Sequence, residues 1–459
     1  MAVFRQAQAR LCDAHCIEYD KSHTFAQLGG SLDPMTPKSV MCRPMSDSTP
    51  QRRMSVSSMN IWRSLRGLPR DVWIVAIASL VNRAGTMVLP FLVLYLTRQL
   101  GFSAPRAGFA LAVYGAGSII SAPLAGKLSD LIGPLPIMRV SLIGTGLLLL
   151  IFPFVESYEV VIALTLAWAI VSEAFRPANL AMIAEIVPPE QLKPAYALFR
   201  LAINLGMSIG PAAAGFIAAH SFAWIFVVDG VTTLAAGAVL LATPIRGGTR
   251  ARRGKDLPAS TGDGLPSLLA DRRMLLFLAA LFLVGIVFFQ HEGPLSLFLV
   301  QDLALSPAFY GMLFTVNTLL IVFVEVPLNA ATANWPHRRG LSIGAFLFAA
   351  GSGLFALASG PAMVIFAIIV WTFGEMLLFP QASAYVAEIA PPERRGQYMG
   401  AYSLAFSIAF AVAPWAGTVT FSELGAKALW IGVFAIGGIA AAMMLFVTTE
   451  MREPKAAAA

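Results

Sequence analysis

Residues 176–190 read RPANLAMIAEIVPPE and residues 379–393 read FPQASAYVAEIAPPE, a repeat at a spacing of 203 residues. The two stretches share a proline near the start, Ala-Glu-Ile in the middle and Pro-Pro-Glu at the end. The same spacing carries Gly108 onto Gly311. The chain is therefore expected to consist of two related halves with the same order of elements.

Long apolar runs surround both stretches and fill nearly the whole chain beyond residue 71. Of the 459 residues, 57% are hydrophobic and only 12% are charged, which is too little charge to cover a soluble protein of this length. A helix crosses a hydrocarbon core of about 30 Å with roughly 20 apolar residues. Twelve such spans are predicted: 72–97, 107–127, 136–156, 160–186, 195–219, 223–244, 274–300, 309–330, 340–359, 362–387, 397–420 and 427–449. We expect an all-α membrane protein of twelve transmembrane helices in two six-helix bundles.

The repeat and the spans divide the chain into five parts. These are a polar tail expected to be disordered (1–68), a six-helix bundle (69–244), a polar linker (245–273), a second bundle (274–449) and a short tail (450–459). Parallel six-helix repeats place a site between the bundles, near the middle of the membrane.

The positive charges indicate the orientation. Almost all Lys and Arg residues fall in the tails, the linker and the loops on one side, while the outer loops hold only Arg98, Arg106 and Lys427. Cytoplasmic loops carry such an excess of positive charge. Both termini and the linker are therefore predicted to be cytoplasmic, in the inner membrane. This location explains the net charge of +7 without a nucleic-acid partner.

Cysteine spacing and catalytic motifs give no sign of an enzyme. Cys12, Cys16 and Cys42 all precede the first span, and no His/Cys pair completes a set of four metal ligands. The chain also lacks a Gly-rich phosphate loop and a nucleophile motif. We expect no metal, no cofactor, no enzymatic activity and no direct use of ATP.

Two short motifs stand in the first half. The loop after the second span reads Gly126-Lys-Leu-Ser-Asp130-Leu-Ile-Gly133. The fifth span contains Gly206-Met-Ser-Ile-Gly210-Pro211-Ala-Ala-Ala-Gly215. Gly206 and Gly210 lie four residues apart on one helix face, so a neighbouring helix can approach closely there, and Pro211 is expected to bend the helix.

With these motifs, residues 72–449 resemble the major facilitator superfamily and, within it, the twelve-helix drug:proton antiporters. The loop resembles that family's Gly-x-Leu-x-Asp-Arg-x-Gly pattern, with Leu131 in place of Arg, and the resemblance implies a gating role for Gly126, Asp130 and Gly133. The helix motif resembles the antiporter signature Gly-x-x-x-Gly-Pro-x-x-Gly-Gly. The family's Arg-x-x-Gln-Gly pattern in the fourth span is missing, because Thr165 stands at the position of its arginine.

Five ionisable residues lie inside predicted spans 1, 4, 7 and 10, which line the central cavity in the resembling family: Arg83, Glu173, Arg176, Glu292 and Glu375. A charge at the bilayer centre costs roughly 2.5–3.5 kcal/mol, so each needs a partner or a water-filled cavity. We predict an ion-pair cluster of the three first-half residues. The two second-half carboxyls, with only His291 as a possible cation nearby, are predicted to carry protons.

The expected cavity is apolar and suits amphipathic or cationic organic molecules. Its predicted aromatic walls are Phe288, Phe289, Trp371 and Phe379. The favoured function is proton-coupled efflux by alternating access, with a small-molecule substrate, protons and the lipid bilayer as partners and a monomer as the working unit. Two alternatives stay open: an importer or symporter of a metabolite or peptide, and a membrane sensor that does not transport.

Overall fold

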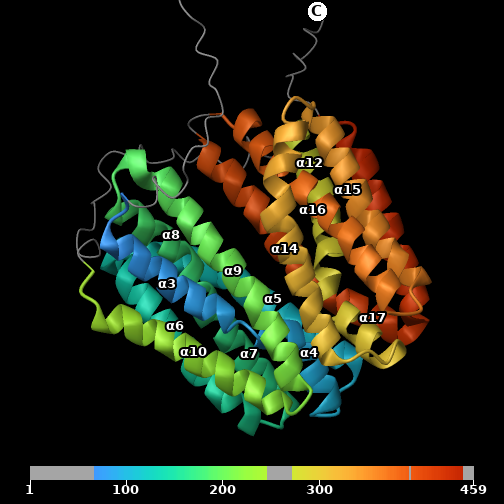
Figure 1. Ribbon diagram of the computed structural model, residues 1–459, viewed down its shortest axis with the longest axis horizontal. Helices are drawn as coiled ribbons and strands as arrows, with labels where there is room; N and C mark the ends of the chain where they lie inside the picture. The colour runs from blue at the N-terminus through green and yellow to red at the C-terminus, as the bar shows by residue number, and fades with distance from the viewer. Residues whose placement is uncertain (1–66, 246–270, 392–393, 448–459) are drawn as a thin grey trace, which may run out of the picture. The chain divides into compact units, whose positions relative to one another are not determined.

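The computed structural model describes residues 67–245, 271–391 and 394–447. Nearly all of the predicted N-terminal tail, residues 246–270 of the predicted linker and the predicted C-terminal tail lie outside the described residues. Within the described ranges every regular element is helical (Figure 1).

The helices of the first half follow the predicted spans, with ends that differ by a few residues. They are α3 (Arg70–Ala84), α4 (Val88–Arg98), α5 (Ala104–Ile132), α6 (Pro134–Ile151), η1 (Phe152–Phe154), α7 (Tyr158–Glu173), α8 (Phe175–Ile186), η2 (Pro189–Gln191), α9 (Leu192–Ala218) and α10 (Phe222–Ala242). Predicted spans 1 and 4 are each divided into two helices, α3 with α4 and α7 with α8.

The second half begins with a span that is divided into four helical pieces. These are α12 (Arg272–Phe288), the 3-10 turn η3 (Phe289–Glu292), α13 (Pro294–Leu297) and the π-helical η4 (Phe298–Asp302). The helices that follow are α14 (Pro307–Thr332), α15 (His337–Leu354), η5 (Phe355–Leu357), α16 (Pro361–Ile389) and α17 (Arg395–Met444).

In the described residues, eleven helical segments are long and apolar enough to cross a membrane. The last of them, α17, has 50 residues, which at 1.5 Å per residue is about 75 Å and more than twice a bilayer core. It consists of two helices that meet at Gly425, where φ is 82° and ψ is 167°. A positive φ of this size favours glycine. Divided at Gly425, α17 supplies the two predicted spans 397–420 and 427–449.

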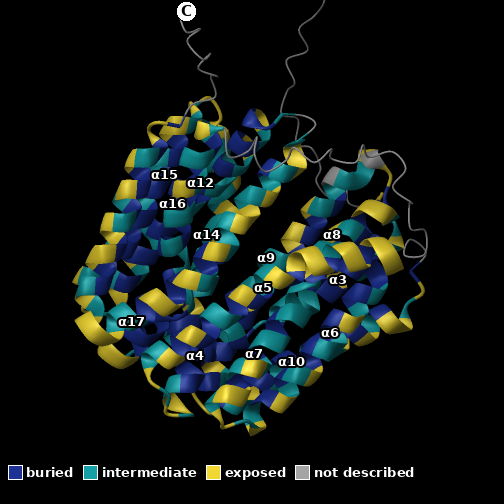
Figure 2. Cartoon of the chain, turned by 180° about the vertical axis from the view of Figure 1, so that it is seen from behind, coloured by how far each residue is buried: buried dark blue, intermediate teal, exposed yellow. Residues whose placement is uncertain are grey.

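The outer surface of the helices is apolar, as a lipid environment requires. Exposed residues recur along the lengths of the helices (Figure 2), and many are large and hydrophobic. On α14, for example, Phe323 is 72% exposed and Val326 is 74% exposed. Such a surface on a soluble monomer would be an association site, but against lipid tails it carries no penalty.

The two halves meet closely along two helix pairs. α5 packs on α17 where Gly115 faces the backbone of Ala411, and α9 packs on α14, its neighbour in Figure 1, where Gly215 faces Pro307. Elsewhere along the same pair, the Thr315 hydroxyl donates to the backbone oxygen of Ser208 at 2.8 Å. The first and second halves are thus held together by small residues that allow backbone contact.

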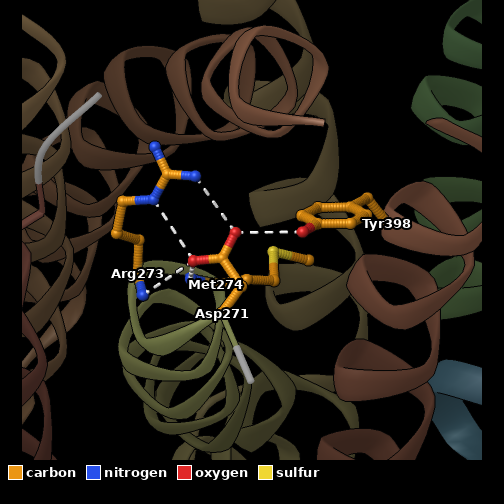
Figure 3. Close-up of polar contacts among 4 residues, drawn as sticks. All are labelled: Asp271, Arg273, Met274 and Tyr398. Atoms are coloured by element: carbon orange, nitrogen blue, oxygen red, sulfur yellow. Dashed lines mark hydrogen bonds and ion pairs between the residues drawn. The ribbon is translucent and has the colours of Figure 1, made fainter. Parts of the chain in front are cut away.

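A polar anchor fixes the start of α12 (Figure 3). The Asp271 carboxylate caps the helix by accepting from the backbone N–H groups of Arg273 and Met274 at 3.1 and 3.4 Å. It also accepts from the Arg273 side chain and, at 2.9 Å, from the Tyr398 hydroxyl on α17. Burial by itself raises the pKa of Asp271, but the hydrogen bonds from Arg273 and Tyr398 outweigh it and leave the pKa below its ordinary value.

Candidate functional site

Two of the five predicted charged positions lie where a membrane helix is interrupted. Arg83 is in the last turn of α3, and Glu292 is the last residue of η3. After Glu292 the chain turns at Gly293, with φ −153° and ψ −65°, before Pro294 starts α13. Interrupted helices expose backbone polar groups inside the membrane, which is tolerated only where protein or a water-filled cavity satisfies them. Breaks in the first span of both halves therefore mark a site.

A cavity of about 200 Å³ lies beside the break that follows Glu292. It receives residues from α9 of the first half and from α12, η3, α13, α14 and α16 of the second. Its lining residues are Asn204, Met207, Phe288, His291, Leu295, Tyr310, Leu313, Phe314, Asn317, Thr318, Ile321, Ile368, Trp371 and Glu375. The wall is mainly aromatic and aliphatic, with one carboxyl, one imidazole and two amides.

Glu375 is the only carboxyl among the lining residues of this cavity. It accepts a hydrogen bond of 2.7 Å from the Asn317 amide, which also donates to the Thr372 hydroxyl at 3.0 Å. No Lys or Arg of the described residues forms an ion pair with it. The nearby carboxylate of Glu325 is instead paired with Arg200 of α9 at 2.9 Å, across the two halves. Glu375 is thus available to a cationic ligand or a proton.

Glu292 has the imidazole of His291 as its neighbour, as the sequence allowed. The His291 Nε2 lies 3.2 Å from Glu292 Oε1, and Glu292 Oε2 is buried with no hydrogen-bond partner in the described residues. His291 lines the cavity but Glu292 does not. The two predicted proton carriers therefore differ in position, with Glu375 at the cavity wall and Glu292 behind His291.

The predicted ion-pair cluster of the first half does not form. Glu173 accepts a hydrogen bond of 2.9 Å from the Tyr114 hydroxyl, and no ion pair joins it to Arg83 or Arg176 in the described residues. Arg83 and Glu173 line a separate polar cavity of about 70 Å³ together with Asp229, while Arg176 is exposed. α7 ends at Glu173 and α8 starts at Phe175, but Ala174 between them is helical (φ −66°, ψ −23°), so Glu173 and Arg176 stay about one turn apart without pairing.

Asp229 has a role that the sequence did not reveal. Its carboxylate accepts from the backbone N–H groups of Met87 and Val88, at 2.9 and 3.1 Å, and so caps α4 where the first span is broken. A helix that starts inside the membrane needs an acceptor for its first N–H groups. The available signal was the polar, glycine-containing stretch Asn82-Arg83-Ala84-Gly85-Thr86 in the middle of the first span.

The aromatic predictions divide into a wall and a layer behind it. Phe288 and Trp371 line the cavity and stack on one another at 5.6 Å between ring centres. Phe289 and Phe379 do not line it. Phe289 packs on Phe410 at 4.8 Å and Phe379 on Phe288 at 5.4 Å. Consecutive residues of a helix point about 100° apart, so Phe289 faces away from the side that Phe288 presents.

The loop motif of the second and third spans makes few contacts. Gly126 has open space around it, and Asp130 is exposed and forms no hydrogen bond or ion pair within the described residues. Gly133 ends α5 with φ 86° and therefore requires glycine. The gating role implied by the resemblance stays a prediction.

The glycine motif of α9 packs as its spacing predicts. A Cβ atom on Gly206 would lie 2.5 Å from the Cβ of Arg83, and one on Gly210 would lie 2.9 Å from the carbonyl oxygen of Thr86. The neighbour on this face is α3 and its continuation toward α4. Gly215 and the Pro211 carbonyl instead face α14, where they meet Pro307 and Gly311. The motif therefore packs α9 against the broken first span of its own half through Gly206 and Gly210, and against α14 of the second half through Gly215.

Comparisons with known proteins agree with this arrangement. Curated relatives include an uncharacterized MFS-type transporter, YqjV of Bacillus subtilis, which is 23% identical over 371 residues, 80% of this chain and 90% of the relative. A Na⁺, Li⁺, K⁺/H⁺ antiporter of Planococcus maritimus is 25% identical over 371 residues, 73% of this chain and 85% of the relative.

Solved structures share the fold at low sequence identity. A POT family transporter in complex with 5-aminolevulinic acid superposes with a TM-score of 0.68 at 14% identity, over 82% of this chain and 96% of that one. A point mutant of the nucleoside transporter NupG superposes with a TM-score of 0.67 at 12% identity, over 82% and 97%. These likenesses confirm the all-helical two-bundle fold class. Residues 74–299 and 292–459 each match the model of the Major Facilitator Superfamily, and the chain is therefore a transporter of that family.

Proposed function

We propose that this protein exports small organic cations, or amphipathic molecules with a cationic group, in exchange for protons by alternating access. The observation that carries the proposal is Glu375, a carboxyl on the wall of an aromatic cavity with no Lys or Arg partner in the described residues. One negative charge in such a site is balanced either by a bound cation or by a proton.

The cavity supplies the groups that an organic cation needs. Trp371 and Phe288 present aromatic rings, whose negative faces attract a cation by roughly 0.5–2 kcal/mol. Asn317 fixes the Glu375 carboxylate by a hydrogen bond. The volume of about 200 Å³ is below the range of about 300–1,000 Å³ for drug-sized ligands, so the proposal is for a small cation in this conformation.

Competition at Glu375 couples the two fluxes. When the site meets the outer phase, a proton binds Glu375 and releases the organic cation. When it meets the cytoplasm, the proton leaves and the ionised carboxylate takes a new cation. One-for-one exchange of a proton for a monovalent cation moves no net charge, so the pH gradient drives it. Each pH unit supports about tenfold accumulation of the cation.

We propose that the interface between α9 and α14 opens and closes during alternating access. The two helices touch through the small residues Gly215 and Gly311. Further along the same pair, the long side chains of Arg200 and Glu325 form an ion pair between the halves. In the proposed orientation both termini and the linker are cytoplasmic, and the loop with Gly126, Asp130 and Gly133 acts as a gate on that side. We also propose that the chain divides at the linker into two bundles, residues 69–244 and 274–449, which move relative to one another.

A second candidate is exchange of a small inorganic cation for protons. The Planococcus maritimus relative is named as a Na⁺, Li⁺, K⁺/H⁺ antiporter. In this chain the oxygen-bearing side chains of Asn317 and Thr318 line the same cavity as the Glu375 carboxyl, and such ligands suit hard cations.

Proteoliposomes with an imposed pH gradient test both candidates. We expect uptake of tetraethylammonium into vesicles that are acidic inside, collapse of that uptake when the gradient is dissipated, and its loss in Glu375→Gln. Larger tetraphenylphosphonium provides a size control, and Na⁺ and K⁺ without an organic cation provide the second arm. Gradient dissipation by Na⁺ or K⁺ alone would favour the second candidate, while gradient-independent transport of every probe would refute proton coupling.

A further inference from the structure

The hydrogen bonds of His291 define where its protons lie. The Nδ1 atom is 2.6 Å from the backbone oxygen of Phe288. A carbonyl oxygen only accepts hydrogen bonds, so Nδ1 must carry a hydrogen. A neutral imidazole has one N–H, and Nε2 would then be a bare acceptor.

In this tautomer the bare Nε2 atom, a hydrogen-bond acceptor, faces the carboxylate of Glu292, which is also an acceptor. Nε2 lies 3.2 Å from Glu292 Oε1, and an ionised carboxylate can only accept. The contact is favourable only with one proton between them, as an imidazolium beside a carboxylate or as a neutral imidazole beside a protonated carboxyl. The second oxygen of Glu292 is buried without a partner in the described residues, which makes an uncompensated negative charge there costly. The pair therefore holds one shared proton.

The pair is also beside the substrate site. His291 lines the cavity together with Glu375, whereas Glu292 lies behind it. The aromatic rings of Phe288, Phe314 and Trp371 pack around the imidazole, at 4.8, 5.8 and 5.9 Å between ring centres.

The titratable groups facing His291 come from three elements. They are Glu292 on its own segment, Glu375 from α16, and Tyr310 from α14, whose hydroxyl donates to the His291 backbone oxygen at 2.7 Å. No Lys or Arg ion pair is made with these carboxyls in the described residues. A proton leaving Nε2 can return to Glu292, which it contacts, or pass to Glu375, which lines the same cavity.

We propose that His291 and Glu292 form a proton store that loads Glu375, with His291 as the transfer group. The inference rests on the proposed exchange of a cation for a proton at Glu375. When the organic cation leaves, the Nε2–H bond breaks, its electron pair stays on nitrogen, and an O–H bond forms on Glu375. A proton from the outer phase then restores the His291–Glu292 pair. The carboxyl that has lost its cation is thus neutralised at once.

Glu292→Gln isolates this role. The glutamine amide can donate to Nε2, so the contact is kept while the exchangeable proton is lost. We expect pH-driven efflux of tetraethylammonium to fall by about tenfold or more, a typical loss for a proton-transfer group. Substrate–substrate counterflow needs no net proton transfer and should stay within about twofold of the parent.

Two further variants separate proton transfer from packing. The double variant His291→Gln with Glu292→Gln replaces the pair by neutral partners: it should remain uncoupled, whereas recovery of pH-driven efflux would show a structural ion pair and overturn the proposal. His220→Gln is the matched control, because its exposed ring also places Nδ1 near a backbone oxygen, that of Phe216 at 3.2 Å, with no acid partner in the described residues. It should transport like the parent.

Solid-state NMR of ¹⁵N-histidine and ¹³C-glutamate protein in liposomes tests the shared proton without transport. It should show either an imidazolium at His291 or a protonated carboxyl at Glu292 at neutral pH. A neutral His291 beside an ionised Glu292, or full pH-driven efflux by Glu292→Gln, overturns the proposal. A parent protein that moves no organic cation on a pH gradient refutes the proposed function instead, and the transfer role with it, while the spectra still decide whether the pair holds a proton.

Discussion

Gly210→Ala adds a single methyl group at the closest approach of α9 to the broken first span. Its carbon would lie 2.9, 3.0 and 3.1 Å from the backbone oxygens of Thr86, Arg83 and Ala84. Backbone oxygens cannot rotate away as a side chain could. The helices must therefore separate by several tenths of an ångström at the point where α3 gives way to α4.

The expected cost follows from two opposing effects. Overpacking of a well-packed interface costs about 1–3 kcal/mol. Alanine is favoured over glycine in a helix by about 0.8–1.0 kcal/mol, which offsets part of this. Gly438→Ala is the matched control, since that glycine of α17 has open space around it and should show only the helix-forming gain.

The assay is the thermal unfolding midpoint in detergent, followed by transport in proteoliposomes. Gly210→Ala should unfold below Gly438→Ala, and Gly210→Leu should insert into the membrane but lose transport, because a branched side chain blocks the approach of α3 altogether. Equal midpoints for the two alanine variants, or normal transport by Gly210→Leu, would refute the close packing as a requirement of the mechanism.

Three further predictions concern charge and orientation. Glu375→Gln should lose pH-driven transport at least about tenfold while still binding uncharged amphipathic ligands, measured by tryptophan quenching; efflux equal to the parent would exclude this carboxyl as the coupling group. Asp271→Asn should lower the unfolding midpoint at pH 7, by an effect of about 1 kcal/mol, because asparagine keeps the helix cap but loses the charge-assisted hydrogen bonds from Arg273 and Tyr398. Because the folded-state pKa of Asp271 lies below its ordinary value of 3.8, the advantage of the parent is present above that value and should vanish as the pH falls through the folded-state pKa; a gap that persists in acid would assign it to packing. Cysteines introduced at Ser260 and Lys455 in a protein without its native cysteines should react with an impermeant thiol reagent only after permeabilisation, and labelling of intact cells would reverse the proposed orientation.

The membrane spans could be read from the sequence because a bilayer imposes a local rule. About 20 apolar residues per crossing is a property of each segment alone, and α5, predicted at 107–127, is found at Ala104–Ile132. The repeat around Pro177 and Pro380 likewise predicts two halves without knowledge of contacts. The spacing of Gly206 and Gly210 predicts a close helix contact, because small residues four apart share one face, but it does not name the partner helix.

The partners of the charged residues were decided by tertiary structure. Arg83 and Glu173 line one cavity without pairing. Asp229, from the sixth span, caps α4, the second helix of the broken first span. Phe288 reaches the cavity while Phe289, about 100° further round the helix, does not, and only the packing of the neighbouring helices decides which of the two faces is the cavity face. Helix breaks change the rotation of every side chain beyond them, and their positions depend on which neighbouring groups can satisfy the freed backbone. Sequence periodicity assumes an unbroken helix, so it locates the ionisable groups of this protein but cannot pair them.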